Sequence, residues 1–129
     1  SYWFADYRAR FSPKDRSGDF SQDLKARDSH VRPGEEAQWC LFDPIVASIF
    51  GSYCASRPGS PEVLLLQSHY LNRSLGQLTE EKAGTRAWQC PEAYFIENGS
   101  YVPNDNVPLQ WTQANLRMAL HWMEVTATP

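Results

Sequence analysis

Three segments of the chain carry apolar residues at three- and four-residue steps, and turn residues separate them, so the sequence favours a mainly helical fold. The first predicted helix begins at Asp43 or Pro44, with Asp43 as its N-cap, and ends near Ser56, because a proline is tolerated only in the first turn. Its stripe, with the residues that lead into it, consists of Trp39, Phe42, Val46, Ile49, Phe50 and Tyr53.

The other two helices have clear boundary signals. Ser60 as N-cap and Pro61 at the first helical position predict a helix that Gly76 closes. The last helix is predicted over residues 109–123, and a short helix or turn is expected over 13–17. The apolar face of the last helix consists of Leu109, Leu116, Ala119, Leu120 and Met123.

A small β-hairpin is predicted over residues 94–102, between the second and the last helix. Asn98-Gly99 lies between two short aromatic and β-branched runs, and both turn residues of such a hairpin need a positive φ. The fold class is therefore mainly α with a small hairpin, in one domain over 1–129. Residues 64–66 are apolar nearly all round the second helix, which predicts contact with further helices.

Composition excludes several classes of protein. The chain has 12 Lys and Arg against 15 Asp and Glu, a net charge of −3, which argues against a nucleic-acid platform. The longest apolar run, 63–66, is far short of a membrane span, and no secretory leader is visible. The three cysteines are expected to be reduced, in a soluble cytoplasmic or organellar protein. No histidine has a partner at metal-ligand spacing and no glycine-rich phosphate loop is present, so neither metal nor cofactor is predicted.

Three blocks of the sequence resemble glycoside hydrolase family 15 and occur in that family's order. They are the acidic-aromatic segment 34–42, the proline-glutamate-aromatic block 91–95, and the proline-leucine-x-tryptophan helix within 104–116. The family contains the glucoamylases, and the regulatory subunits of phosphorylase kinase share its fold. The resemblance implies that the chain is the C-terminal portion of an (α/α)₆ toroid, whose remaining helices come from the same or another chain.

The resemblance also implies a reaction and a site. Inverting hydrolysis of an α-glucosidic bond uses two carboxyls about 6.5–9.5 Å apart, one as general acid and one as general base. The family's base lies in the block that 91–95 resembles, which assigns Glu92. Read without the family, Glu92 is a helix cap or a surface ion-pair partner. The family's acid lies in a tryptophan-glutamate block that this chain lacks. Residues 122–124 resemble that block only in their letters, since they lie on the last helix, where the family has no acid.

Three further residues are candidates for substrate binding. Glu36 would hydrogen-bond sugar hydroxyls, Trp39 would stack on a ring, and Trp111 would line the pocket. The alternatives are a turn cap for Glu36 and core packing for the two tryptophans. Asp105 and Asn106 are predicted to be loop residues that fix the approach to the last helix.

These observations support three hypotheses. The first is part of an inverting α-glucosidase that acts on α-glucans or maltooligosaccharides. The second is a non-catalytic glucosidase-like subunit with a regulatory or scaffold role, as in phosphorylase kinase. The third is a free-standing helical domain that matches the family by chance and folds alone as a monomer.

Overall fold

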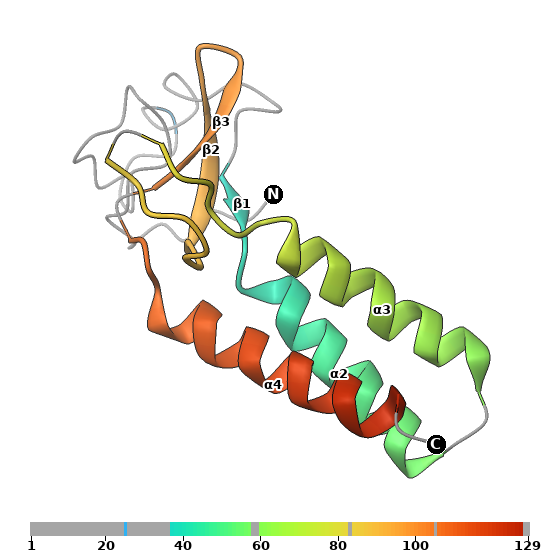
Figure 1. Cartoon of the computed structure of the whole chain (residues 1–129). Coiled ribbons are helices and arrows are strands. Elements are labelled where there is room, and N and C mark those ends of the chain that lie inside the picture. Colours follow the sequence, from blue (N-terminus) through green and yellow to red (C-terminus); the bar gives the residue numbers. More distant parts are fainter. Residues whose placement is uncertain (1–24, 26–36, 58–59, 83, 105, 128–129) are drawn as a thin grey trace.

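The computed structural model describes residues 25, 37–57, 60–82, 84–104 and 106–127 (Figure 1). Within them the protein is mainly helical, with a small three-stranded antiparallel sheet. Helices α2, α3 and α4 lie side by side, and the sheet lies at one end of them. The turn or helix predicted over 13–17, and Glu36, fall outside the described residues.

Helix α2 (Phe42–Ser56) begins one residue before the predicted start, and Asp43 is not its N-cap. The N-cap position is Leu41, and no side chain caps it. The Asp43 carboxylate lies inside the first turn, where it accepts hydrogen bonds from Arg73 Nε at 2.9 Å and from Gln77 Nε2. Arg73 lies in the last turn of α3 and Gln77 lies just after it, so Asp43 joins the start of α2 to the end of α3 instead of capping α2.

Most of the large apolar stripe of α2 is not covered by the described residues. Ile49 is 61% exposed, and Phe42 and Tyr53 are also exposed. The buried residues are mostly small: Asp43, Pro44, Ala47, Gly51 and Cys54. Small side chains let neighbouring helices approach closely, and a Cβ at Gly51 would lie 2.5 Å from Trp122 Cβ of α4. The neighbouring helices therefore pack against the face of α2 that carries its small residues.

Helix α3 (Pro61–Leu75) has the predicted bounds, with Ser60 at the N-cap and Gly76 at the C-cap. The Ser60 hydroxyl, however, donates to the Glu62 carboxylate at 3.2 Å and caps no backbone group. Its buried face is Gln67, Leu71 and Ser74.

Helix α4 (Gln110–Ala127) begins one residue after the predicted start and extends four residues past the predicted end. Leu116 and Ala119 are buried as predicted, and Met123 packs against the same core. Leu120 is 45% exposed, so the predicted face is wrong at that position. The buried residues of α4 are Thr112, Leu116 and Ala119, and both α2 and α3 contact this helix.

The core joins all three helices to the segment before the sheet, through Ala47, Leu71, Cys90, Leu116 and Ala119.

The sheet contains the predicted hairpin and one strand that the sequence did not predict. Strand β2 (Ala93–Glu97) pairs with β3 (Ser100–Pro103), and the turn residues Asn98 and Gly99 have φ values of 51° and 75°, which confirms the hairpin. Strand β1 (Gln38–Trp39) pairs with the other edge of β2 and leads directly into α2. The sheet is thus fastened to the bundle through α2.

Candidate functional site

Glu92 lies immediately before β2, where the pairing with β1 ends. Its backbone oxygen accepts a hydrogen bond from Cys40 N at 2.8 Å, which continues the β1–β2 ladder by one step. Glu92 as a whole is only 4% exposed. The carboxylate is therefore enclosed by protein and belongs to a backbone position that the neighbouring strand fixes.

Two asparagine amides hold the Glu92 carboxylate. Asn104 Nδ2 and Asn106 Nδ2 each donate to Glu92 Oε2 at 2.8 Å. The backbone of Asn106 also accepts a hydrogen bond from Glu92 N at 3.1 Å. An amide NH₂ group can only donate, so this oxygen of Glu92 is an acceptor in both contacts.

The loop after β3 places these amides because it continues alongside β2. Asn104 N donates to Ala93 O at 2.9 Å, one step beyond the last strand pair, and Leu109 N donates to Cys90 O at 2.7 Å. The sequence prediction gave Asn106 only a loop role, and it placed Asn104 at the start of the family-like block 104–116 without a role of its own. The Asn-x-Asn spacing directly after the hairpin was the available signal.

Two buried thiols accompany the site. Burial, with smaller contributions from the charges of Asp43, Cys90 and Glu92, raises the pKa of Cys40 to about 12. Burial also raises the pKa of Cys90. Because the thiolate is the nucleophilic form, both side chains are held in their unreactive state at neutral pH.

The predicted substrate-binding residues are placed differently from one another. Trp39 of β1 is half-buried and its Cα pairs with that of Ala93, the residue after Glu92. Trp111, in the first turn of α4, is 61% exposed, so its surface is largely uncovered by the described residues. The register therefore brings Trp39 to the strand pair that holds Glu92.

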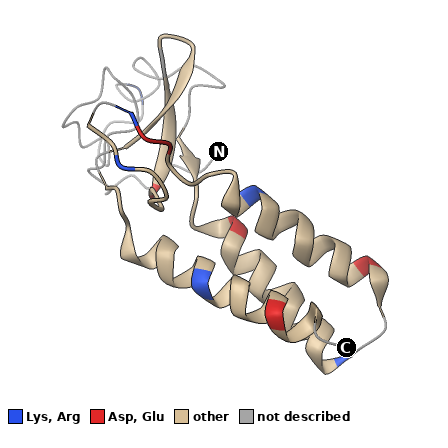
Figure 2. Ribbon diagram, viewed as in Figure 1, with Lys and Arg blue, Asp and Glu red and all other residues tan. Residues whose placement is uncertain are grey.

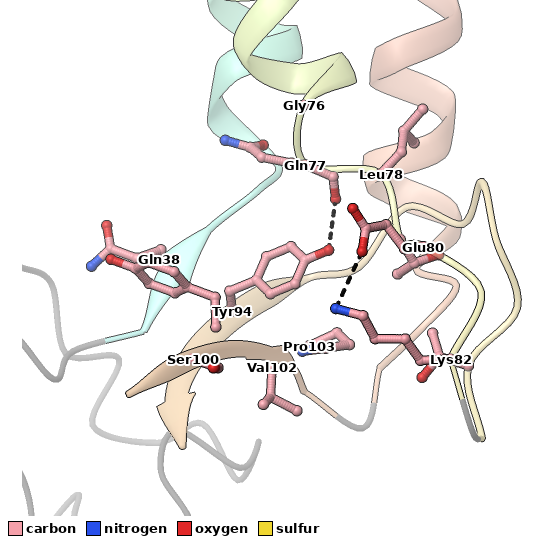
Figure 3. A pocket seen from close by; sticks show the side chains of 13 residues that line it. Gln38, Gly76, Gln77, Leu78, Glu80, Lys82, Tyr94, Ser100, Val102 and Pro103 are labelled. Carbon is pink, nitrogen blue, oxygen red and sulfur yellow. Dashed lines mark hydrogen bonds and ion pairs between the residues drawn. The ribbon is translucent and has the colours of Figure 1, made fainter. Parts of the chain in front are cut away.

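A cavity of about 610 Å³ lies between the hairpin and the loop after α3 (Figure 3). Its walls include Gln38, Gln77, Thr79, Tyr94 and Tyr101. The Tyr94 hydroxyl points toward Gln77 and donates to its backbone oxygen at 3.1 Å, whereas the Gln77 side chain points away from the ring.

The charged side chains at this cavity, Glu80 and Lys82, lie at its exposed edge. Lys82 Nζ lies 3.2 Å from a Glu80 carboxylate oxygen, and both side chains are well exposed. Burial raises the pKa of Tyr94 to about 12, with smaller contributions from the charges of Cys40 and Glu80. Tyr94 is two residues after Glu92 on the same strand, and Glu92 is not among the cavity-lining residues. The cavity therefore adjoins the Glu92 site and is separate from it.

Within the described part of the chain, no group of three His, Cys, Asp or Glu side chains is close enough to hold a metal ion. None of the helices there combines the length and apolar character that crossing a bilayer requires.

Comparisons with protein-family models, with curated proteins and with solved structures found no match. Fold and site therefore define a class only: a mainly helical domain with a small antiparallel sheet and a buried, amide-held carboxylate at their junction.

Proposed function

We propose that the chain is the C-terminal portion of an (α/α)₆ toroid that hydrolyses α-glucans or maltooligosaccharides with inversion, and that Glu92 is its general base. The observation that carries this proposal is the Glu92 carboxylate, 4% exposed and held through Oε2 by two amides at 2.8 Å. Both amides donate, so Glu92 Oε2 accepts two hydrogen bonds, and they hold the carboxyl group in the fixed position that a general base requires. The resemblance of 91–95 to the family block assigns the same residue independently.

The chemistry divides between two carboxyls. Glu92 takes a proton from a water molecule, which attacks the anomeric carbon from the face opposite the leaving group. A general acid on the other side of the sugar protonates the departing glycosidic oxygen. That acid comes from outside residues 1–129, because the chain lacks the family's tryptophan-glutamate block.

The surface of the three helices supports the toroid. Charged residues are sparse along them, as Figure 2 shows, and number five in the sequence of α2, α3 and α4: Asp43, Glu62, Arg73, Arg117 and Glu124. Large apolar side chains are instead exposed on every helix, among them Ile49 at 61%, Leu65 at 70% and Met118 at 50%. Extended apolar surface of this kind is typical of an interface. It favours further helices packed on this bundle over a free-standing domain.

The second candidate is a non-catalytic glucosidase-like subunit with a regulatory or scaffold role. The missing acid block is the observation that favours it. The two candidates differ in whether the complete protein contains that acid, so the sequence beside this segment or in its partner discriminates them.

Replacement of Glu92 tests the catalytic proposal. In the complete protein, Glu92→Gln should lower kcat on maltooligosaccharides by roughly 100- to 10,000-fold, because it removes the base and keeps the shape. Glu62→Gln, the same change on the exposed first turn of α3, is the control and should leave kcat unaltered. Equal kcat for wild type and Glu92→Gln, with both proteins folded by circular dichroism, would remove Glu92 from this role.

A further inference from the structure

We infer that Asn104 and Asn106 are positioning residues for Glu92, which fix the direction of its carboxylate relative to the attacked water. This inference rests on the proposed function for its catalytic consequence, and on the contacts of the three side chains for its structural basis. It concerns an Asn-x-Asn pair that neither the sequence prediction nor the family resemblance assigned to the site.

The two asparagine amides converge on one oxygen of Glu92. Both amides donate to the same oxygen, Glu92 Oε2, at 2.8 Å, and they reach it from one loop. Two donors on one oxygen restrict rotation of the carboxyl group more than one donor can, because both directions must be kept at once. A general base has to meet its proton in a narrow geometry, so such restriction serves catalysis.

Asn106 also holds the backbone of Glu92. Its main-chain oxygen accepts from Glu92 N at 3.1 Å while its side chain donates to the carboxylate. One residue thus binds both ends of Glu92. A displacement of the loop would move the backbone and the carboxylate together.

Asn104 has an acceptor atom that is unpaired within the described part of the chain. This residue is 2% exposed, and its Oδ1 has no hydrogen-bond partner among the described residues. The amide cannot be reversed without turning an oxygen toward Glu92 Oε2, so the contact with the carboxylate fixes Oδ1 on the other side. Leaving a buried acceptor unpaired destabilises the fold. The role of an asparagine at this position is therefore the hydrogen bond that its Nδ2 donates to Glu92.

Asn106 carries the test, because it is exposed and its truncation leaves no buried cavity. In the complete protein, Asn106→Ala should lower kcat about 10- to 100-fold, the effect of losing one hydrogen bond to a charged group. KM should stay within about twofold, because Asn106 acts through Glu92 and not on the substrate. Asn72→Ala, the same change on the exposed surface of α3, is the matched control and should alter neither constant.

A double-mutant comparison shows whether Asn106 acts through Glu92. Added to Glu92→Gln, Asn106→Ala should reduce kcat no further, because the group that it positions is already lost. A kcat unchanged by Asn106→Ala alone, or a full additional loss in the Glu92→Gln protein, would overturn the inference.

A measurement without turnover separates this inference from the proposed function. In nuclear magnetic resonance spectra, Glu92→Gln should shift the side-chain amide signals of Asn104 and Asn106 and leave the signal of Asn72 in place. If the wild-type protein hydrolyses no glucan, the proposed function fails, and these signals still decide whether the two asparagines hold Glu92. Unshifted signals of Asn104 and Asn106 would refute the inference by themselves.

Discussion

Gly51 occupies a position in α2 where a side chain has no room. A Cβ there would lie 2.5 Å from Trp122 Cβ and 2.8 Å from Gln67 Nε2, and real Cβ atoms do not approach other atoms so closely. Gly51→Ala should therefore force α4 outward and lower the free energy of unfolding by about 1–3 kcal/mol, in spite of the better helix propensity of alanine. Urea unfolding followed by circular dichroism measures this change.

Gly76 is the matched control for that substitution. Its nearest neighbours to a new Cβ are Asn72 O at 3.4 Å and Arg73 O at 3.6 Å, which are ordinary contacts, and its φ of −68° is accessible to any residue. Gly76→Ala should leave the unfolding free energy unchanged or raise it by up to about 1 kcal/mol. If Gly51→Ala changed the free energy of unfolding no more than Gly76→Ala does, α2 and α4 would not be as close at Gly51 as described here.

For some residues of this chain the neighbouring sequence determines the conformation and contacts, and for others it does not. The positive φ values of Asn98 and Gly99 follow from local chemistry, because few residues tolerate that conformation, and they were predicted correctly. The pairing of Glu92 with Asn104 and Asn106 spans 12 and 14 residues and depends on how the loop after β3 returns to β2. Local sequence patterns cannot predict a contact of this kind, because its partners are far apart in the sequence.

The helices also have features that local sequence determines and features that depend on tertiary packing. Proline, serine and glycine signals set the bounds of α3 correctly, since they act within one turn of each helix end. Periodicity located the apolar stripe of α2 but did not show which of its residues the neighbouring helices α3 and α4 cover. Helix spacing reports which residues share a face, whereas which face is covered depends on how closely the other helices can approach. In α2 the small residues Ala47 and Gly51 decide that.

Strand β1 was missed for a different physical reason. It consists of two residues, Gln38–Trp39, and a two-residue strand has no alternation that could be recognised. It exists because β2 offers an open edge next to the start of α2. Its pairing partner, and not its own sequence, makes it a strand.

The assignment of faces on α2 and α3 can be tested by truncating one large side chain on each. Ile49 of α2 is 61% exposed, so Ile49→Ala should change the unfolding free energy by less than about 0.5 kcal/mol. Leu71 of α3 is 5% exposed and belongs to the core, so Leu71→Ala should cost about 2–5 kcal/mol. Urea unfolding of the 129-residue chain measures both, and a large loss from Ile49→Ala would restore the apolar stripe as the inner face.

At the scale of the whole molecule, the sheet and the helical bundle are held together by contacts between their side chains and turns. Cys40 connects β1 to α2, and the Tyr94 hydroxyl of β2 donates to the backbone of Gln77 after α3. Asp43 in turn binds Arg73 and Gln77, which joins the start of α2 to the end of α3. Two members of this junction, Cys40 and Tyr94, carry protons that the fold retains to unusually high pH.

That retention makes the stability of the junction depend on alkaline pH. The pKa of Cys40 is about 12 in the folded protein against an ordinary 9.0, and that of Tyr94 is about 12 against 10.0, chiefly because burial disfavours both anions. Above pH 9 for Cys40, and above pH 10 for Tyr94, the unfolded chain has lost protons that the folded chain keeps. Unfolding then releases protons, so rising pH favours it. The stabilisation is complete below pH 9 and is lost progressively as the pH approaches 12.

Urea unfolding in the presence of a thiol reductant, at about pH 8 and about pH 11, measures this dependence. The free energy of unfolding should fall over that interval, with roughly 2–3 kcal/mol of the fall due to Cys40. The double variant Cys40→Ala, Tyr94→Phe removes both protons and should show a clearly smaller fall, whatever its stability at pH 8. The fall that remains in it belongs to the lysines and other tyrosines. An identical fall in wild type and double variant would mean that neither group is more protonated in the fold than in the unfolded chain, and that the junction is open to water.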